Sequence, residues 1–495
     1  MKKRLIYLMI CLCAVVFASC EDFLNVKPQT QVPGEDFYNQ ETGYQDALTG
    51  CYMKMTSTNL YGRFMTMSGI DYLAQYYNKM SSSSVEYALK SFNYNNGDVQ
   101  SQFKLVYNEL YNIILQANDI IEHIDANGAE VIKSQYKRDL IKGEALAIRA
   151  FCHFDLLRVF GQVPVNAVKN VSLPYSETTG VDARPLYSFD QYVAKIKSDL
   201  GAAAQLLEKS PEKEFKTLFA TPTEEMISKS SELKDNFYYY RKFRFNYYAV
   251  KALLARVYLY VGDTHNAYDA AMEIINEKSA GGSLMTFANE QDMGKGNYTL
   301  PTETIFALSS MELESRTGEL NNLFKLGNPT SDPMLINSDR KKELFQTRNT
   351  GNNNRYNKLW GEYLTGAGQP VPYLKKYFQN EASLSENDKL TQRWQIPVLR
   401  LSEMYLIAME CSSNLQQVNS MFYTYMSARN EQPAEFASLD EAKAEIINEY
   451  RREFLAEGQM FFTYKRLGAQ NMLWNSNTVT EANYIVPVPA SENIK

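Results

Sequence analysis

The sequence predicts a mainly α-helical protein in which a scaffold of helical hairpins carries a large irregular lobe rich in loops. Three observations lead to this prediction. Apolar residues recur at steps of three and four in several long segments. Small residues stand where two antiparallel helices would touch, and residues 279–394 lack the helical period.

A short leader precedes the first predicted helix. Positive charges at residues 2–4 are followed by an apolar stretch over 5–17 and by small residues before Cys20, as in a secretory signal. The apolar stretch is too short to span a bilayer. We therefore expect residues 1–19 to be a lipoprotein signal peptide, cleaved before a lipid-bearing Cys20, and residues 20–35 to be a lipidated tether. An ordinary secretory leader is the alternative.

Residues 36–278 form the helical N-terminal part of the predicted scaffold. Its first helix begins near Thr42, which has capping-box spacing with Gln45. Glycine and serine break the period over 57–100, which predicts a long aromatic loop region, and the period resumes over 103–124. The apolar face of the first helix consists of Tyr44, Leu48, Cys51 and Met55.

The clearest predicted helix covers residues 141–159. Phe151 and Phe154 form a second apolar row beside the main one. A helix that is apolar on two sides packs between two other helices. Gly161 and Pro164 end it. The main row is Ile141, Ala145, Ile148, Cys152, Leu156 and Val159.

A helical hairpin is predicted over residues 247–275, after an amphipathic helix over 188–207 and a charged, tyrosine-rich insertion over 209–244. Small residues stand where the two helices of the hairpin would touch, which is the arrangement of tetratricopeptide-like repeats. They are Ala252, Ala255, Gly262, Ala267 and Ala271.

Residues 279–394 form the predicted irregular lobe, with turns, short strand-like pieces and a Gly-Asn run over 351–354. Loops of such length are usually functional or disordered. Residues 395–495 complete the scaffold. Their predicted helices cover 398–414, 417–430 and 439–466.

Composition and residue spacing exclude several classes of function. The net charge of −6 argues against a nucleic-acid partner. Cys51, Cys152 and Cys411 stand singly at apolar positions, so no disulfide framework or metal spacing is visible. The three histidines, His123, His153 and His265, also lack ligand spacing. We expect no cofactor and no metal.

A pair of carboxylates can carry out acid/base catalysis. Glu453 and Glu457 lie one helical turn apart, but two carboxylates on one helix face do not flank a substrate by themselves. Beside Arg451, Arg452 and Lys465 we expect them to form ion pairs. Phosphate loops, serine elbows and zinc-binding helix motifs are absent from the sequence, so we predict no catalytic residues.

Tyrosine is the compositional outlier, with 35 residues. Its flat apolar face and hydroxyl group suit sugar rings, peptide backbones and helix packing alike. The alternative to ligand contact is that the loop rings fill the core of the lobe, and for Trp394 we favour that structural role. The candidate ligand contacts are Tyr72, Tyr76, Tyr77, Asn354, Arg355, Trp360 and Tyr363.

Six ordered segments match the motifs of one family, over 22–28, 111–118, 144–164, 252–259, 397–406 and 449–468. In this order they resemble the SusD/RagB family, surface lipoproteins for nutrient capture in Bacteroidetes-type bacteria, along almost the whole chain. The segment 144–164, with its Gly-x-x-Pro exit, is the most specific. Gln459 and Thr463 depart from the pattern, since the family often has a basic residue and Asp there.

The resemblance implies tetratricopeptide-like helical pairs with an irregular lobe, anchored by lipid to the outer membrane and facing the cell exterior. It implies a non-catalytic protein that binds glycans and passes them to a SusC-like TonB-dependent transporter. Two other binding roles stay open, uptake of oligopeptides as in RagB and a protein–protein scaffold without ligand. A glycoside hydrolase, which would shorten its ligand, is the enzymatic alternative.

Overall fold

The computed structural model describes most of the chain after residue 36. The described residues are 37–77, 81–165, 170–180, 185–279, 282–315, 336–345, 351–364, 368, 370–377, 385 and 389–490. The predicted signal peptide, Cys20 and the tether lie outside them. Helices predominate, as the sequence predicts, and the strands are short and form two-stranded sheets.

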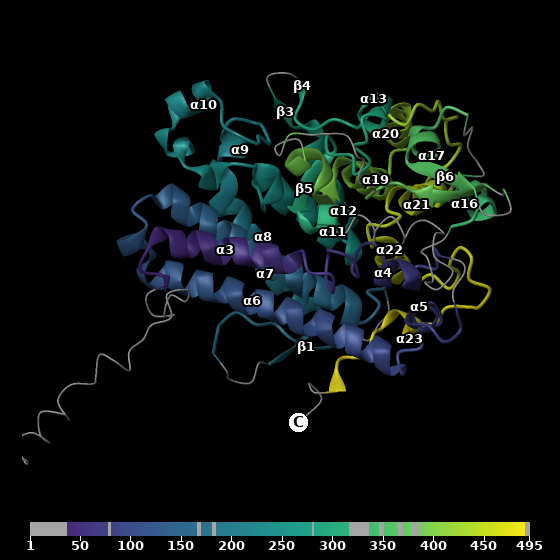
Figure 1. Ribbon diagram of the computed structural model, residues 1–495, viewed down its shortest axis with the longest axis horizontal. Coiled ribbons are helices and arrows are strands. Elements are labelled where there is room, and N and C mark those ends of the chain that lie inside the picture. Colours follow the sequence, from purple (N-terminus) through teal and green to yellow (C-terminus); the bar gives the residue numbers. More distant parts are fainter. Residues whose placement is uncertain are drawn as a thin grey trace, which may run out of the picture.

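The scaffold is a continuous array of helices in which each packs on the next (Figure 1). Contacts lead from α3 to α6, α7, α8, α11, α12 and α19, and α19 contacts both α20 and α21. The bounds are α3 (Glu41–Met55), α6 (Gly97–Val131), α7 (Gln135–Phe160), α8 (Phe189–Leu206), α11 (Tyr247–Tyr260), α12 (Thr264–Asn276), α19 (Leu401–Cys411), α20 (Leu415–Ser427), α21 (Leu439–Glu453) and α22 (Met460–Leu467).

The predicted packing of the central helix and the hairpin is confirmed. Helix α7 lies between α6 and α8 and ends at Gly161, and α11 and α12 pack as a hairpin. Several helices begin at a capping residue that directly precedes them in the sequence. Ser188 caps α8 through a capping box with Gln191. The capping box predicted at Thr42 is wrong, because α3 begins at Glu41 after Gln40, whose side chain makes no cap bond.

The shorter elements lie mainly outside the array. The helices are α4 (Gly69–Leu73), α5 (Val85–Lys90), α9 (Pro211–Glu214), α10 (Glu224–Lys229), α13 (Glu290–Gly294), α14 (Glu312–Ser315), α16 (Ser338–Phe345), α17 (Asn354–Lys358) and α23 (Glu481–Tyr484). The strands are β1 (Asn170–Pro174), β2 (Leu186–Ser188), β3 (Lys278–Ser279), β4 (Gly282–Ser283), β5 (Thr304–Ser309), β6 (Trp360–Leu364), β7 (Pro370–Leu374) and β8 (Gln395–Arg400).

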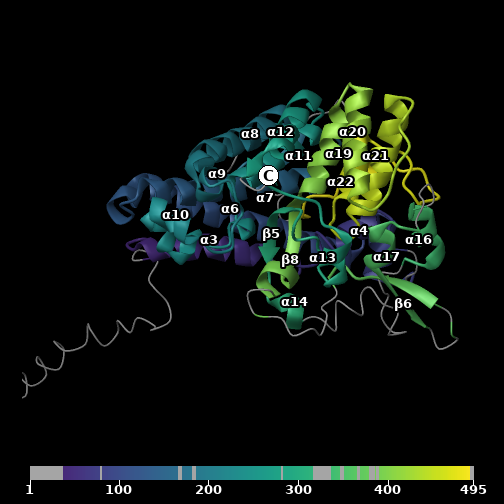
Figure 2. The same ribbon diagram turned by 90° about the horizontal axis from the view of Figure 1, so that it is seen from above.

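One antiparallel strand pair attaches the lobe to the scaffold, and a second pair lies within the lobe. Strand β5 pairs with β8, which leads directly into α19, and β6 pairs with β7. Figure 2 shows β5, β6 and β8 along one long side of the molecule, and α8, α12 and α20 along the opposite side. The lobe therefore faces away from those three scaffold helices.

Two sequence predictions of element type are wrong. The segment 57–100, expected to be a loop region, contains α4, α5 and the start of α6. The single helix expected over 439–466 is two helices, because Ala456 and Gly458 adopt positive φ angles of 63° and 67° between α21 and α22. A helix cannot continue through such residues.

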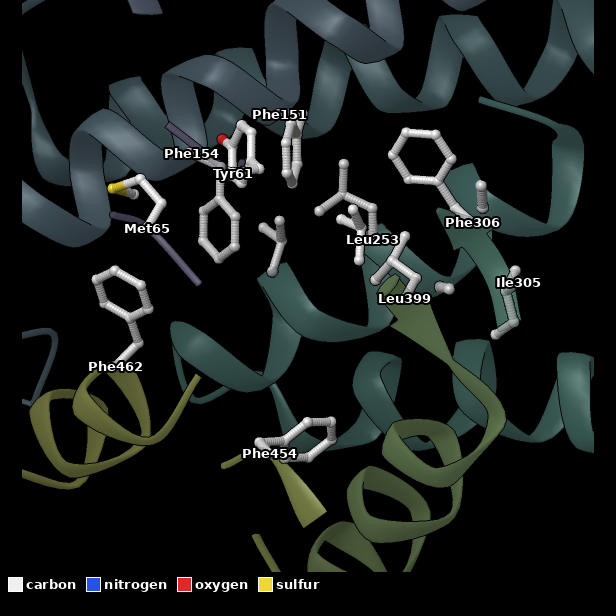
Figure 3. Close-up of a cluster of buried hydrophobic side chains, with 14 of the residues drawn as sticks. Tyr61, Met65, Phe151, Phe154, Leu253, Ile305, Phe306, Leu399, Phe454 and Phe462 are labelled. Atoms are coloured by element: carbon white, nitrogen blue, oxygen red, sulfur yellow. The ribbon is translucent and has the colours of Figure 1, made fainter. Parts of the chain in front are cut away.

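One hydrophobic core joins the N-terminal and C-terminal helices (Figure 3). Phe151 and Phe154 of α7 point into the same cluster as Leu253 of α11 and the strand residues Phe306 and Leu399 (Figure 3). All five are buried. The two halves of the scaffold thus share apolar burial, the main favourable term in folding.

The turn at Gly458 needs glycine for two reasons. Its φ is +67°, and a Cβ atom there would lie 1.9 Å from the backbone oxygen of Met65. We predict that Gly458→Ala lowers the free energy of unfolding by more than about 2 kcal/mol, measured by urea denaturation. Gly294→Ala is the control, because its Cβ would meet nothing within 4 Å. Equal stability of the two variants would contradict this account of the turn.

His153 of α7 is a buried histidine held neutral by its surroundings. Its Nδ1 bonds the Tyr192 hydroxyl at 2.8 Å, the Ser176 N–H donates to its Nε2 at 3.2 Å, and its ring stacks on Tyr175. Burial, with a smaller contribution from the positive charge of Arg149, lowers the pKa of His153 to about 3. Protonation of the folded protein at this site therefore requires strong acid.

This burial predicts a pH dependence of stability. Between about pH 6.5 and pH 3 the unfolded imidazole binds a proton and the folded one does not, so the free energy of unfolding falls as pH falls, by ~1.4 kcal/mol per unit. We expect His153→Gln to remove this contribution, measured as a shallower loss of stability in acid. His265→Gln, at an exposed site, is the control and should keep the wild-type slope.

Candidate ligand-binding surface

The first group of predicted contacts, Tyr72, Tyr76 and Tyr77, lies in the interior. Their exposed fractions are 3%, 2% and 1%. The Tyr76 hydroxyl donates to the backbone oxygen of Arg451 at 2.8 Å, and the Tyr77 hydroxyl donates to that of Met67 at 2.9 Å. Burial raises the pKa of both phenols. The Tyr76 bond holds the turn after α4 against α21, and the Tyr77 bond ties that turn to the segment before α4.

The second group lies in and beside α17. Arg355 is buried and pairs with Glu449 at 2.8 Å and Glu453 at 2.9 Å. Asn354 is also buried, and its amide donates to the Ala428 oxygen at 3.5 Å.

Trp360 of β6 is buried as well, and the ammonium of Lys341 lies 5.5 Å from the centre of its ring. The side chain of Tyr363 lies outside the described residues. Six of the seven predicted contacts therefore have packing roles, which favours the packing alternative, and ligand contact stays a prediction for all seven. Trp394 is buried and donates to Glu314 at 3.1 Å, in keeping with its expected structural role.

A buried ion network holds the lobe on the scaffold, and Arg400 is its centre. The Arg400 guanidinium, at the end of β8, donates to Glu453 at 2.7 Å, to Glu457 at 2.8 and 3.0 Å, and to Glu303 at 3.1 Å. All four side chains are nearly inaccessible to solvent. Glu453 and Glu457 are therefore ion-pair residues, as predicted, but their partners differ from the predicted ones.

Further cations surround the same carboxylates. Arg429 lies 3.2 Å from Glu453, and Lys376 lies 2.6 Å from Glu457. Burial opposes the ionisation of Glu453, but Arg429, Arg400 and Arg355 hold its pKa well below the usual range. Since each carboxylate is fixed by cations, the pair is not arranged for acid/base catalysis.

Two predicted partners of these glutamates have other contacts. Arg452 pairs with Glu445 and Glu449, each at 2.6 Å. The Lys465 ammonium donates to the backbone oxygens of Arg158 and Gly161 at the end of α7, at 2.8 and 2.6 Å. Such a contact satisfies carbonyls that a helix end leaves without intrahelical partners.

Half-exposed aromatic rings and cations gather on the lobe. The Lys375 ammonium donates to the Tyr298 hydroxyl at 3.3 Å and lies 4.4 Å from the centre of that ring. Tyr373 faces Gly361 across the β6–β7 pair, and a Cβ on Gly361 would lie 2.4 Å from its ring. Burial and the nearby Tyr298 raise the pKa of Tyr373. We call Tyr298, Tyr373 and Lys375 the lobe cluster.

Helix α16 links the lobe to the loop after α22. The Arg340 guanidinium lies 4.7 Å from the centre of the Trp474 ring and donates to the backbone oxygens of Gln75 and Tyr76. The next residue, Lys341, lies 4.0 Å from the centre of the Tyr356 ring. Two neighbouring cations of one short helix thus contact aromatic rings in different segments.

The residues of the lobe cluster and Trp474 are not among the ligand contacts predicted from the sequence. Residues 370–374 read Pro-Val-Pro-Tyr-Leu without an alternation of apolar and polar residues, so the sequence does not show that Tyr373 and Leu374 lie on different faces. The glycine opposite Tyr373 could not be known before the pairing of β6 with β7 was seen.

Two open grooves lie elsewhere on the molecule. One, of about 420 Å³, lies between the start of α6 and residues 486–490. The other, of about 650 Å³, lies along α20 beside residues 433–436 and has Tyr423 in its wall. Tyr423 is 54% exposed. It provides an accessible aromatic ring distant in sequence from the lobe cluster.

The described residues show features of a non-covalent binding site. Aromatic faces, hydroxyls and an ammonium group suit a neutral ligand rich in hydroxyl groups. Within the described ranges, His, Cys, Asp and Glu side chains form no group of three or more that could hold a metal ion. No helix in that part of the chain is long and apolar enough to cross a membrane.

Comparison with known proteins places this fold among solved structures. A SusD superfamily protein of Bacteroides thetaiotaomicron superimposes with a TM-score of 0.67 at 19% identity, covering 92% of this chain and 97% of that one. A laminarin-binding SusD-like protein gives 0.64 at 16% identity, covering 92% and 97%. A SusD-like carbohydrate-binding protein of Bacteroides vulgatus gives 0.64 at 16%, covering 87% and 84%.

Sequence comparisons agree with the structural ones. Residues 22–223 match a family described as starch-binding and associating with the outer membrane, and residues 337–493 match the SusD family. SusD-like protein P2 of Formosa agariphila is 22% identical over 100% of this chain and 98% of its own length. SusD-like protein P25 of that organism is 28% identical over a match that covers 30% of this chain and 28% of the length of P25.

The ion network predicts a large effect of removing one charge from its centre. We expect Glu453→Gln to lower the free energy of unfolding by about 3–5 kcal/mol, because buried Arg355, Arg400 and Arg429 would lose a shared anion. Urea denaturation measures this. Glu225→Gln breaks an exposed pair with Lys229 and should leave stability unchanged. If Glu453→Gln left the free energy of unfolding unchanged, the network would not be what holds the lobe.

Proposed function

Because this chain belongs to the SusD/RagB family, we propose that it is a non-catalytic, cell-surface lipoprotein that binds glycans and delivers them to a SusC-like TonB-dependent outer-membrane transporter. The observation that carries the glycan part is the lobe cluster, in which Tyr298 and Tyr373 offer aromatic surface beside the Lys375 ammonium. A sugar ring stacks its C–H face on such rings and bonds its hydroxyls to nearby polar groups.

The relatives support a carbohydrate ligand. One family description that matches this chain names starch binding, and similar folds include a protein named for laminarin binding and another named for carbohydrate binding. These names belong to those proteins. For this chain they make polysaccharides the first ligand class to test.

The anchoring and partner parts of the proposal rest on the sequence and the family. Cys20 follows a leader with the pattern of a lipoprotein signal, and two or three acyl chains on one cysteine would anchor the protein firmly. The matched family description names association with the outer membrane. A transporter partner would receive the ligand from the lobe.

A non-catalytic role agrees with the arrangement of the carboxylates. Glu453 and Glu457, the pair that the sequence offers for acid/base chemistry, are bound by Arg400 and neighbouring cations. Glycoside hydrolysis needs two carboxyl groups on either side of a bound substrate.

The first experiment is native affinity electrophoresis of residues 21–495 in gels that contain single polysaccharides. Retardation by one polysaccharide supports glycan capture and identifies the ligand class. Peptide mixtures are tested in parallel by calorimetry, and heat from peptides without retardation by any polysaccharide would favour the oligopeptide alternative. A shortened glycan after incubation would contradict the non-catalytic role.

A variant pair tests the lobe cluster. We predict that Tyr298→Ala weakens glycan affinity roughly ten-fold, since an aromatic stacking contact contributes about 1–3 kcal/mol in a comparable case. Tyr423→Ala removes the exposed ring on α20 and should leave affinity unchanged. Both are measured by the retardation in the gel series. Loss of affinity in Tyr423→Ala alone would move the site to the groove on α20.

A further inference from the structure

A small pocket, about half open to the surface, lies where five scaffold helices meet. Its volume is about 30 Å³. Helices α7, α11, α19, α21 and α22 each contribute to its wall, through Arg158, Arg256, Glu403, Tyr450 and Phe462 respectively. It therefore lies at the junction of the N-terminal and C-terminal parts of the scaffold.

Three residues that line this pocket each carry a buried polar atom without a partner among the described residues. These atoms are Nη1 of Arg256 and the hydroxyl oxygens of Tyr260 and Tyr450. Their side chains belong to residues only 6%, 3% and 3% exposed. Buried polar groups are almost always hydrogen bonded, so three such atoms in residues that line one pocket indicate an occupant.

The orientation of Arg256 is fixed by its other bonds. Its Nε and Nη2 donate to Glu403, each at 2.6 Å, and Nη2 also donates to the Val398 oxygen at 2.6 Å. Only Nη1 is left over. The Tyr260 ring packs edge-on against Phe154, with 5.4 Å between ring centres, which fixes that ring as well.

Charge decides which kind of occupant fits. Each arginine of the wall already has a carboxylate partner, since Arg158 bonds Asp155, Arg256 bonds Glu403, and Arg466 bonds Glu410. An anion in the cavity would have no free counter-charge, and burying an uncompensated charge is strongly unfavourable. The occupant is therefore neutral.

The donors and acceptors around the pocket limit the choice of occupant further. A guanidinium N–H only donates, whereas a tyrosine hydroxyl both donates and accepts. A water molecule can accept from Arg256 and from one hydroxyl and donate to the other. A cavity needs roughly 10–15 Å³ to hold one water molecule, so this one has room for one or two.

We propose that ordered water occupies this cavity and bridges Arg256, Tyr260 and Tyr450, so that solvent completes the contact between α11 and α21. The site is a structural binding site for water at the junction of the scaffold halves. It is independent of the glycan ligand, because every group involved lies in the scaffold helices and not in the lobe.

Tyrosine-to-phenylalanine variants test the proposal through the sign of their effect. With water present, Tyr260→Phe and Tyr450→Phe each remove a hydrogen bond, and each should lower the folding equilibrium constant about five-fold in urea titrations. The double variant should lose less than the product of the single effects, because both hydroxyls bind the same water. In a dry cavity, removing an unpartnered hydroxyl would leave the constant unchanged or raise it.

Tyr248→Phe is the matched control. The Tyr248 hydroxyl is also buried and has no partner among the described residues, but it does not line this cavity. We expect this variant to keep the wild-type constant or exceed it. Losses as large as those of Tyr260→Phe would mean that the effect is unrelated to the cavity.

A crystal structure of the wild-type protein, with and without a bromide soak, gives the direct measurement. Electron density within hydrogen-bond distance of Arg256 Nη1 and both hydroxyls, without an anomalous signal, is the expected result. Anomalous bromide density at this position would overturn the neutral occupant. An empty cavity would overturn the proposal altogether.

Discussion

The rest of the structure depends on the compensation of charge around Arg400. This side chain belongs to the strand that joins the lobe to the scaffold, and its carboxylate partners come from α21, from the turn after it and from the segment before β5. Burying such groups is tolerable only when all of them are present with good geometry. The network therefore specifies one relative position of lobe and scaffold, beyond what apolar packing alone would select.

That position bears directly on the proposed ligand surface. Lys375 and Lys376 follow β7, and their side chains contact different groups. Lys376 is buried and donates to Glu457 and to the backbone oxygen of Leu455, while Lys375 reaches the Tyr298 hydroxyl. The ammonium of the lobe cluster is thus one residue away from a fixed point of the ion network. A glycan would meet groups that are already held in place, which lowers the entropy lost on binding.

The sequence was a good guide to the helices and a poor guide to the site. Periodicity identified α7 and the α11–α12 hairpin because their apolar rows are local properties of the chain. Whether a tyrosine faces solvent is not local. Tyr76 is buried by its bond to a carbonyl 375 residues away, and Arg355 is buried by glutamates about a hundred residues further on. The same limit applies to Tyr373, which is positioned by a glycine in the partner strand.

The contact between α22 and the end of α7 has a consequence for the order of folding. Lys465 binds the carbonyl of Arg158, 307 residues earlier in the chain, and Asp71 accepts from the N–H of Ala456, 385 residues later. Contacts between residues so far apart in sequence form late, because a long loop must close before they are made. The N-terminal helices therefore reach their final packing only after the last helices have been synthesised. Shortening the chain from its C-terminus would expose the middle of the core, and would not leave a smaller intact domain.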